Sequence, residues 1–211
     1  MMNKKNFLLV VLASVLAFGY EISLNGFFEN LNSAGIPQGW VRNGWKGYEP
    51  ACAVACFPME GITGNVLRIS DVQSKNGAAV NTDFYPGRSG DSIRFSFLAR
   101  GKGKARLRMY FKTVEGEWNF ASPREFAFEP TAEWTRFSAT LPVLNGDNGE
   151  TGSFDVSMET SRQGGELELA DFHAELTEGV FRGENPFPQN WTLFCPMDAN
   201  YEPTVEELAA I

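Results

Sequence analysis

The chain has 211 residues, of which 26 are acidic and 18 are basic, so its formal net charge is −8 at neutral pH. An acidic chain has no overall attraction for nucleic acid or for an anionic membrane surface, and neither is an expected partner. A hydrophobic fraction of 43%, with 18 Phe residues and 21 Gly residues, excludes a disordered chain and favours an all-β domain of ordinary size.

The first 19 residues have the pattern of a signal peptide. Lys4 and Lys5 give a positive start, and an apolar run of about a dozen residues follows over 7–18. This run is short for a bilayer span, and small residues flank the predicted cleavage point before Tyr20. We therefore expect a secreted or periplasmic protein with no membrane segment in its mature form; an uncleaved N-terminal anchor is the alternative.

Next, Leu24–Asn30 is predicted to form the first strand of the mature fold. A loop rich in Gly, Asn and aromatic residues follows over 32–50, and it contains Trp40, Trp45 and Tyr48. Because exposed aromatic rings in loops are suited to stacking on the apolar faces of sugars, Trp45 and Tyr48 are ligand-binding candidates. Loop packing is the alternative for both residues.

The chain contains three cysteines, Cys52, Cys56 and Cys195, so at least one thiol has no partner within the chain. In a continuous strand the α-carbons of Cys52 and Cys56 would lie about 13 Å apart, whereas a disulfide requires less than about 7 Å. These two residues can therefore form a bridge only if the chain turns between them. We therefore interpret the cysteines as small apolar residues of the core rather than as a disulfide or a metal site.

Further strands are expected at intervals of about ten to fifteen residues, with turn-rich segments between them and no convincing helix. This spacing is typical of a β-sandwich or barrel. The expected strands are Val66–Ser70, Ala78–Phe84, Ile93–Arg100, Ala105–Lys112, Glu125–Phe128, Trp134–Leu141, Ser153–Glu159 and Gly165–Leu176.

Two of these strands alternate most clearly and are predicted to form a hairpin. Gly101-Lys102-Gly103 would join them. Seven basic residues and no acidic residue lie between Arg94 and Lys112. The outward face could therefore hold uronate or sulfate groups, with Arg94, Arg108 and Tyr110 as ligand-binding candidates and Trp118 beside them. Cross-strand pairing of the cations with acids on neighbouring strands is the favoured alternative; the acids considered are Glu166, Glu168 and Asp155.

The composition changes after the last expected strand. Residues 178–189 are rich in Gly and Pro and are predicted to be a linker. Residues 190–211 contain a strand-like segment and a capped helix start, with Thr204 as the N-cap and Glu207 three positions later. They are interpreted as the truncated start of a second domain, or as a C-terminal tail.

Several stretches, in this order, resemble the galactose-binding-domain-like carbohydrate-binding modules of xylan- and glucan-binding type found in bacterial glycoside hydrolases. The resemblance covers residues 20–177 approximately and implies a jelly-roll β-sandwich. Trp40 and Trp134 match positions that are usually structural in the family. The stretches are Asn25–Glu29, Pro37–Trp40, Gly64–Ile69, Asp91–Arg100, Glu133–Ser138 and Leu167–Phe172.

The same resemblance implies a structural calcium ion where the first and last strands meet. Glu29 and Asp171 match the acidic positions, and carboxylate oxygens suit Ca²⁺. The family often has a further acid or Asn beside the second position, whereas this chain has Ala170 and Phe172. The alternative is that both acids are surface residues at strand ends.

The function implied by the resemblance is a secreted, non-catalytic module that recognises a polysaccharide or oligosaccharide, attached to a neighbouring domain. No catalytic residues are predicted: His173 is the only histidine, and among 26 acids some pair will match glycosidase spacing by chance. Two alternatives remain. One is a structural spacer or docking domain without glycan binding, and the other is the N-terminal part of a polysaccharide-degrading enzyme.

Overall fold

The structure, a computed structural model, describes residues 20–42, 52–71, 77–160 and 164–178. These ranges contain strands and loops and no helix, so none of their segments is a helix able to cross a membrane. The strands are β1 (Tyr20–Ile22), β2 (Trp40–Arg42), β3 (Cys52–Pro58), β4 (Asn65–Asp71), β5 (Ala79–Thr82), β6 (Tyr85–Pro86), β7 (Ser92–Lys102), β8 (Ala105–Thr113), β9 (Trp118–Phe128), β10 (Thr135–Pro142), β11 (Thr151–Thr160) and β12 (Glu166–Glu178).

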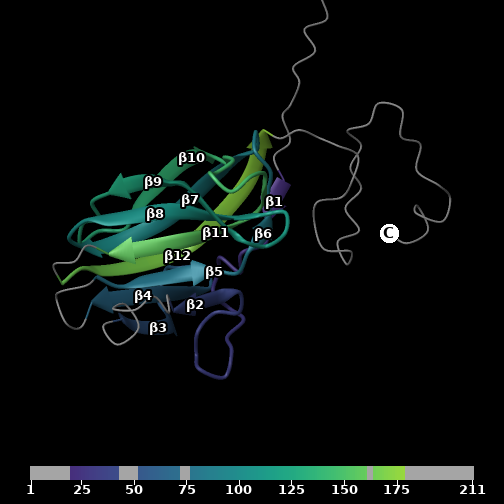
Figure 1. The fold of residues 1–211 in the computed structure, drawn as a ribbon. Coiled ribbons are helices and arrows are strands. Elements are labelled where there is room, and N and C mark those ends of the chain that lie inside the picture. Colours follow the sequence, from purple (N-terminus) through teal and green to yellow (C-terminus); the bar gives the residue numbers. More distant parts are fainter. Residues whose placement is uncertain (1–19, 43–51, 72–76, 161–163, 179–211) are drawn as a thin grey trace, which may run out of the picture.

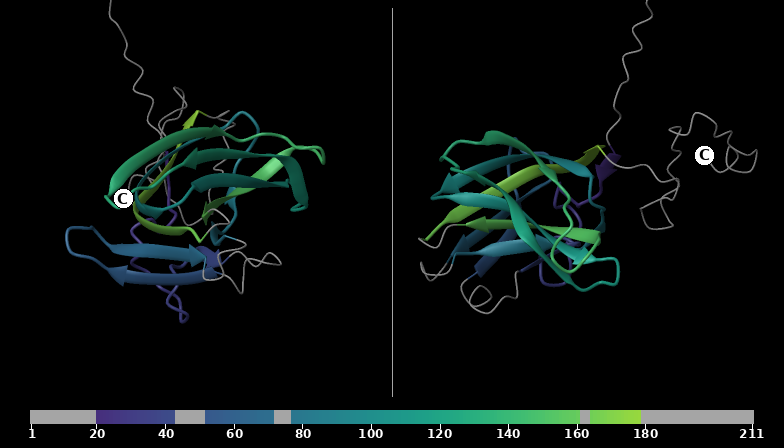
Figure 2. Two further views of the ribbon diagram at one scale, coloured as in Figure 1. Left: turned by 90° about the vertical axis from the view of Figure 1, so that its left-hand side faces the viewer. Right: turned by 45° about the horizontal axis from the view of Figure 1, so that its top comes forward.

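The strands form two antiparallel sheets that pack against each other (Figures 1 and 2). The first sheet has the order β10-β7-β12-β4-β3, with β1 paired to β12. The second has the order β2-β5-β11-β8-β9, with β6 paired to β11. From β6 to β12 the chain crosses repeatedly from one sheet to the other, as in a jelly roll. The predicted all-β sandwich is confirmed.

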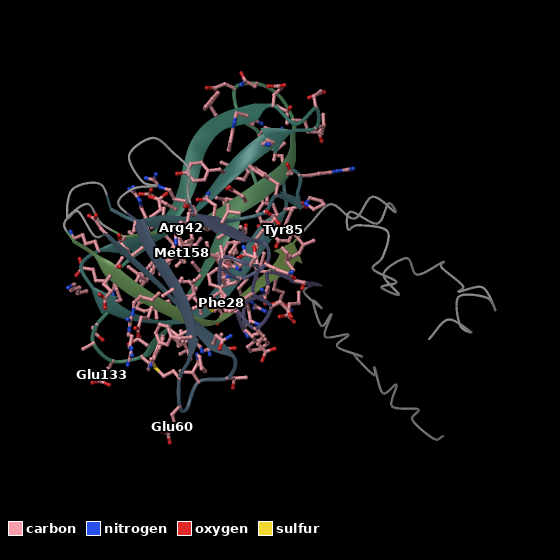
Figure 3. The ribbon with its side chains drawn as sticks, turned by 90° about the horizontal axis from the view of Figure 1, so that it is seen from below. Phe28, Arg42, Glu60, Tyr85, Glu133 and Met158 are labelled. Atoms are coloured by element: carbon pink, nitrogen blue, oxygen red, sulfur yellow. The ribbon has the colours of Figure 1, made fainter. Side chains whose placement is uncertain are left out.

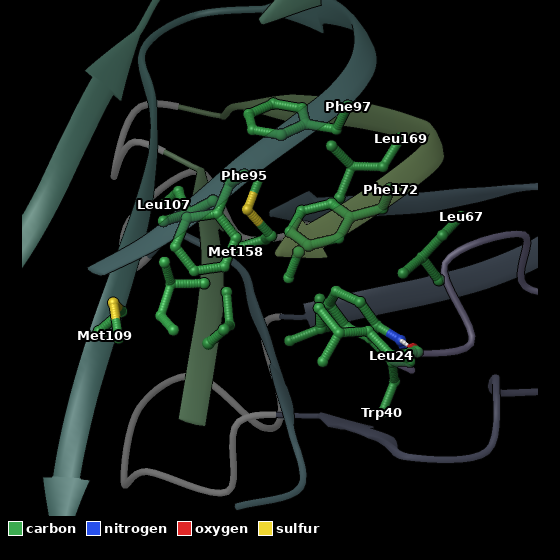
Figure 4. Close-up of a cluster of buried hydrophobic side chains, with 14 of the residues drawn as sticks. Leu24, Trp40, Leu67, Phe95, Phe97, Leu107, Met109, Met158, Leu169 and Phe172 are labelled. Carbon is green, nitrogen blue, oxygen red and sulfur yellow. Dashed lines mark hydrogen bonds between the residues drawn. The ribbon is translucent and has the colours of Figure 1, made fainter. Parts of the chain in front are cut away.

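Aromatic and aliphatic side chains from both sheets fill the space between them (Figure 4). Phe97 of β7 stacks on Phe172 of β12 with 5.3 Å between ring centroids. Trp40 closes one end of this core: it is 1% exposed, and its Nε1 donates a hydrogen bond to the Leu24 carbonyl. The structural role predicted for Trp40 is confirmed. Figure 3 shows Phe28 and Met158 toward the interior, with Glu60 and Glu133 at the periphery.

The predicted first strand over Leu24–Asn30 is wrong, because the strand at this end is β1, and residues 23–30 form a turn. Asn25 and Phe28 have positive φ angles of 49° and 54°, which interrupt an extended chain. This turn nevertheless braces the closing strand as expected: the Phe172 amide donates to the Gly26 carbonyl. A Cβ on Gly26 would lie 1.6 Å from the Phe172 carbonyl oxygen, so no larger residue fits at this contact.

The predicted hairpin between the two most regular strands is also wrong. β7 pairs with β10 and β12 in the first sheet, whereas β8 pairs with β9 and β11 in the second. Gly101 and Gly103, with φ angles of 152° and 82°, carry the chain across the sandwich. Each strand does bury the alternate residues that were expected. The alternation identifies a buried face, but both sheets bury their faces in the same core, so it does not identify the pairing partner.

β3 is a continuous strand, so the turn that a Cys52–Cys56 bridge requires is not present. Cys56 is a free, half-buried thiol whose Sγ contacts the Phe28 carbonyl, and burial raises its pKa to about 11. It therefore remains a protonated packing residue at neutral pH. The predicted signal peptide, linker and C-terminal segment lie outside the described residues, as do Cys195 and the side chain of Cys52.

Candidate ligand-binding face

The side chains of the second sheet that point away from the core form a surface that we call the outer face. On β8 the core takes Leu107, Met109 and Phe111, so the alternate residues face outward. On β11 the core takes Phe154, Val156 and Met158. The outer face thus carries Arg106, Arg108, Tyr110 and Lys112 from β8, Asp155, Ser157 and Glu159 from β11, Asn81 from β5, and Trp118 from β9.

A row of polar residues runs along the centre of this face on β11. Asp155, Ser157 and Glu159 point away from the core yet are only 3%, 0% and 2% exposed. Asn81 connects the row: its Nδ2 donates to Asp155 Oδ2 at 2.9 Å, and its Oδ1 accepts from Ser157 Oγ at 3.3 Å. Buried polar groups of this kind are held in place by their hydrogen bonds and form a rigid surface.

Two glutamates, Glu159 and Glu125, pair with the two arginines of β8. Arg106 Nε donates to Glu159 Oε2 at 2.6 Å, and Tyr110 donates its hydroxyl to Glu159 Oε1 at 3.0 Å. Arg108 pairs with Glu125 at 2.8 Å and lies 3.7 Å from Glu159. Cross-strand pairing, the favoured alternative for the basic cluster, is therefore what the structure has. Of the three acids considered, Glu168 pairs with Arg100 on the first sheet, whereas the partners of Arg106 and Arg108 are Glu159 and Glu125. The geometry leaves Arg106 and Arg108 engaged rather than open to a uronate or sulfate.

Asp155 is the exception in this network. Its Oδ1 is buried and has no hydrogen-bond partner in the described part of the chain. Burial raises the pKa of the Asp155 carboxyl to about 6, and Glu159 adds to this rise, while Asn81, the Tyr110 backbone and Lys112 oppose it. The outer face therefore contains a buried carboxyl whose protonated form is favoured by burial.

Exposed aromatic rings lie at one end of the face. Trp118 is 49% exposed and Phe120 is 70% exposed, and they alternate on β9 around the inward Asn119. Phe84 lies edge-on to Trp118 at 5.6 Å, and Lys112 Nζ lies 4.4 Å from the Phe84 ring centroid. We call Phe84, Trp118 and Phe120 the aromatic group. Sequence reasoning missed Phe84 and Phe120; the alternation of Trp118 and Phe120 around a polar residue is the pattern that could have indicated the second.

The structure places the predicted ligand residues that it describes on two different sheets. Arg108, Tyr110 and Trp118 share the outer face. Arg94 does not, because it lies on β7 in the first sheet and donates its Nε to Glu175 at 3.0 Å. Its grouping with Arg108 depended on the predicted hairpin and is wrong for the same reason. Trp45 and Tyr48 lie outside the described residues.

The predicted calcium position is occupied by ion pairs. Asp171 Oδ1 lies 2.7 Å from His173 Nε2, and Asp171 Oδ2 accepts from Arg136. Burial acts to raise the pKa of Asp171, but Arg136 and His173 hold it below its usual value. Glu29 is exposed, and within the described ranges no three His, Cys, Asp or Glu residues are grouped closely enough to hold a metal ion. These residues as placed do not fit a calcium ion, and the calcium site stays a prediction.

Comparisons with known proteins bear on the fold. No family model matches the chain, and no curated protein matches its sequence. Among solved structures, the enzymatically active domain of tailspike protein 4 from bacteriophage CBA120 has a TM-score of 0.53 and 14% identity over 72% of this chain and 21% of that chain. This chain therefore spans about a fifth of the tailspike chain. The similarity shows a shared β-sandwich fold.

Two further solved structures contain carbohydrate-binding modules. The CBM22-1-GH10 part of xylanase 10B from Clostridium thermocellum, complexed with xylohexaose, has a TM-score of 0.49 and 13% identity over 74% of this chain and 28% of that one. A CBM4 structure has a TM-score of 0.47 and 16% identity over 72% of this chain and 97% of that one. At these identities the likeness concerns the fold alone.

Proposed function

We propose that this chain is a non-catalytic carbohydrate-binding module, exported to the periplasm or secreted, and that it binds an oligosaccharide or polysaccharide on the outer face of the second sheet. One observation carries the proposal: the exposed Trp118 and Phe120 lie on the same sheet face as a rigid row of buried polar side chains. The motifs shared with carbohydrate-binding modules support the same function.

The chemistry of this face suits a sugar. Sugar rings have apolar faces that stack on aromatic side chains, and their hydroxyls need donors and acceptors at fixed positions. Phe120 is 70% exposed, so most of its large apolar side chain faces solvent and does not pack in the core. Half-buried Asn81 supplies polar atoms on this face, and its amide is held in place by the buried Asp155 and Ser157.

A catalytic role for the same face has less support. Glu159 and Asp155 are its two buried acids, but Glu159 is held by Arg106 and by the Tyr110 hydroxyl. Glu159 and Asp155 are 2% and 3% exposed, so neither carboxyl is accessible to a substrate as a glycosidase requires. The second candidate function is a structural spacer. It is favoured by the same Arg106 and Tyr110 contacts, which form a closed network without any ligand.

Replacing the exposed rings tests the proposal. The double variant Trp118→Ala/Phe120→Ala should weaken binding to neutral plant polysaccharides at least tenfold, since both stacking surfaces are lost. Affinity electrophoresis against xylan, β-glucan and galactan, followed by calorimetry with matching oligosaccharides, measures the effect. Trp134→Ala is the matched control, because this half-buried Trp contacts Arg100 on the first sheet.

Two outcomes contradict the proposal. If the unaltered protein retains no glycan, neutral or anionic, the spacer function replaces glycan binding. If it binds a glycan and the double variant binds equally well, the binding site lies away from the aromatic group.

A further inference from the structure

Three cations of β8 point outward, and they differ in which residues lie across from them. Arg106 lies opposite Glu159 of β11, and its Nε is 2.6 Å from that carboxylate. Arg108 lies opposite Glu125 of β9, and its Nε is 2.8 Å from that carboxylate. Opposite charges on neighbouring strands stabilise a sheet. Both arginines therefore have their counterions within the chain.

Lys112, the third cation, has no acid across from it. Its cross-strand neighbours are Ser153 on β11 and Trp118 on β9. Burial raises the pKa of the Asp155 carboxyl and the charge of Lys112 opposes this rise, so the two charges attract each other. Among the residues that the structure describes, however, no carboxylate forms an ion pair with Lys112. The chain thus leaves this ammonium without a counterion in contact.

The Lys112 ammonium lies within the aromatic group. Its Nζ is 4.4 Å from the Phe84 ring centroid and 5.4 Å from the Trp118 ring centroid. Contacts of this kind hold a cation over the faces of the rings. Lys112 is partly exposed and Trp118 is 49% exposed. A sugar that stacks on the exposed rings would therefore bring its substituents close to Nζ.

The charges on the page restrict the class of sugar. An ammonium only donates hydrogen bonds, and its strongest partners are anions such as carboxylates. The whole chain has a net charge of −8, so its overall field repels a densely charged polyanion. Attraction to Lys112 acts over a short range. The glycan that satisfies both conditions is a mostly neutral polymer that carries occasional acidic sugars.

Building on the proposed glycan site, we propose that Lys112 is its specificity-determining residue: the aromatic group binds a neutral backbone, and Lys112 Nζ forms an ion pair with the carboxylate of a uronic acid in the same glycan. The ligand then supplies to Lys112 the kind of partner that Glu159 and Glu125 supply to the two arginines. The acidic ligand expected from the basic residues of β8 is thereby assigned to Lys112 rather than to Arg108.

The experiment uses pairs of polymers that differ only in their carboxylates. Glucuronoxylan is compared with the same polymer after reduction of its carboxyl groups. Neutral β-glucan and galactan are compared with the same polymers after limited oxidation of C6 to a carboxylate. Affinity electrophoresis at pH 7.5 identifies the backbone that is bound, and calorimetry with oligosaccharides from that pair gives the ratio of the two affinities.

The unaltered protein should bind the carboxylated form about fivefold more tightly than the neutral form, as expected for a partly exposed ion pair. Higher salt should reduce this ratio, because salt screens the pair. Lys112→Gln should bring the ratio close to one, whereas Lys112→Arg keeps the charge and should retain a preference. Lys104→Gln is the matched control: it removes the same charge from an 80% exposed side chain just before the other end of β8, and its ratio should equal that of the unaltered protein.

The outcomes separate the two proposals. If the unaltered protein binds a neutral backbone but has no preference for its carboxylated form, the role of Lys112 is overturned and the proposed function stands. A preference that persists in Lys112→Gln, or that is lost equally in Lys112→Gln and Lys112→Arg, also overturns the role of Lys112 alone. Absence of binding to every polymer, neutral or carboxylated, overturns the proposed function and this inference together.

Discussion

Two carboxylates, one on the outward side of each sheet, are equally buried but differently partnered. Glu168 of β12 and Asp155 of β11 are both 3% exposed. Glu168 uses both oxygens: Oε1 accepts from Arg68 at 2.7 Å and Oε2 from Arg100 at 2.5 Å. Asp155 has the Asn81 amide on one oxygen and no donor on the other. Equal burial therefore has opposite energetic consequences on the two sheets.

The aromatic side chains on the two sheets also differ in how far they are covered by other residues. On the first sheet Arg68 lies over the Phe57 ring at 4.8 Å and Arg100 over the Trp134 ring at 4.9 Å, so each cation that holds Glu168 also packs on a ring, although both stay partly exposed. On the second sheet Trp118 and Phe120 remain open to solvent. Glu168 thus has a charged partner on each oxygen, whereas Asp155 Oδ1 has no hydrogen-bond partner among the described residues, and Trp118 and Phe120 keep exposed ring surface. This difference directs the search for a ligand to the second sheet.

The largest effect should come from removing Glu168. Glu168→Ala leaves Arg68 and Arg100 facing each other without their shared carboxylate. We expect a loss of about 2–3 kcal/mol in the free energy of unfolding, below the range for fully buried pairs because water screens the partly exposed arginines. Urea denaturation at pH 7.5 measures this, with Glu166→Ala as the control on the same strand. A loss equal to that of the control would mean that the Glu168 pairs contribute nothing.

Asp155→Asn should change stability in the opposite direction. The folded pKa of about 6 lies above the usual 3.8, so the folded protein binds this proton more tightly and loses stability as pH rises from about 4 to 6. The amide cannot ionise, and we expect the variant to be about 1–2 kcal/mol more stable than the unaltered protein at pH 7.5. Urea denaturation at pH 4 should show no such gain. A variant that is destabilised at pH 7.5 would make Asp155 a structural residue like Glu168.

The smallest effect should come from His173 on the first sheet. Its ring nitrogens lie 2.9 Å from Glu21 and 2.7 Å from Asp171. Burial acts to lower the pKa of His173, but these two acids raise it above its usual value. This stabilisation is present below the ordinary pKa of about 6.5 and is lost as pH rises through the raised value. The ring is 35% exposed, so His173→Gln should cost less than about 1 kcal/mol at pH 6 and still less at pH 9. Equal losses at the two pH values would show that the charge on His173 is not involved.

Much of the fold could be predicted because alternation is a local property. Phe95 and Phe97 on β7, and Leu107 and Met109 on β8, are buried as their spacing indicated. The turn at Asn25–Phe28 could not, because its positive φ angles are stabilised by distant contacts. The Asn25 side chain bonds the carbonyls of Asn30 and Gln38. The ligand candidates followed the same division: Tyr110 was placed by alternation on its strand, whereas the partners of Arg94 were not.

By itself, the sequence determined that this chain is an all-β protein and which residues of β7 and β8 enter the core, because the two-residue period follows from the backbone of each strand alone. Only the tertiary structure decided which strands are neighbours. It placed Arg94 and Arg108 on different sheets, gave Arg108 its carboxylate partners, and buried Asp155 on the outward side of β11. Such contacts join residues far apart in the chain, and they depend on register and sheet assignment, which local patterns do not encode.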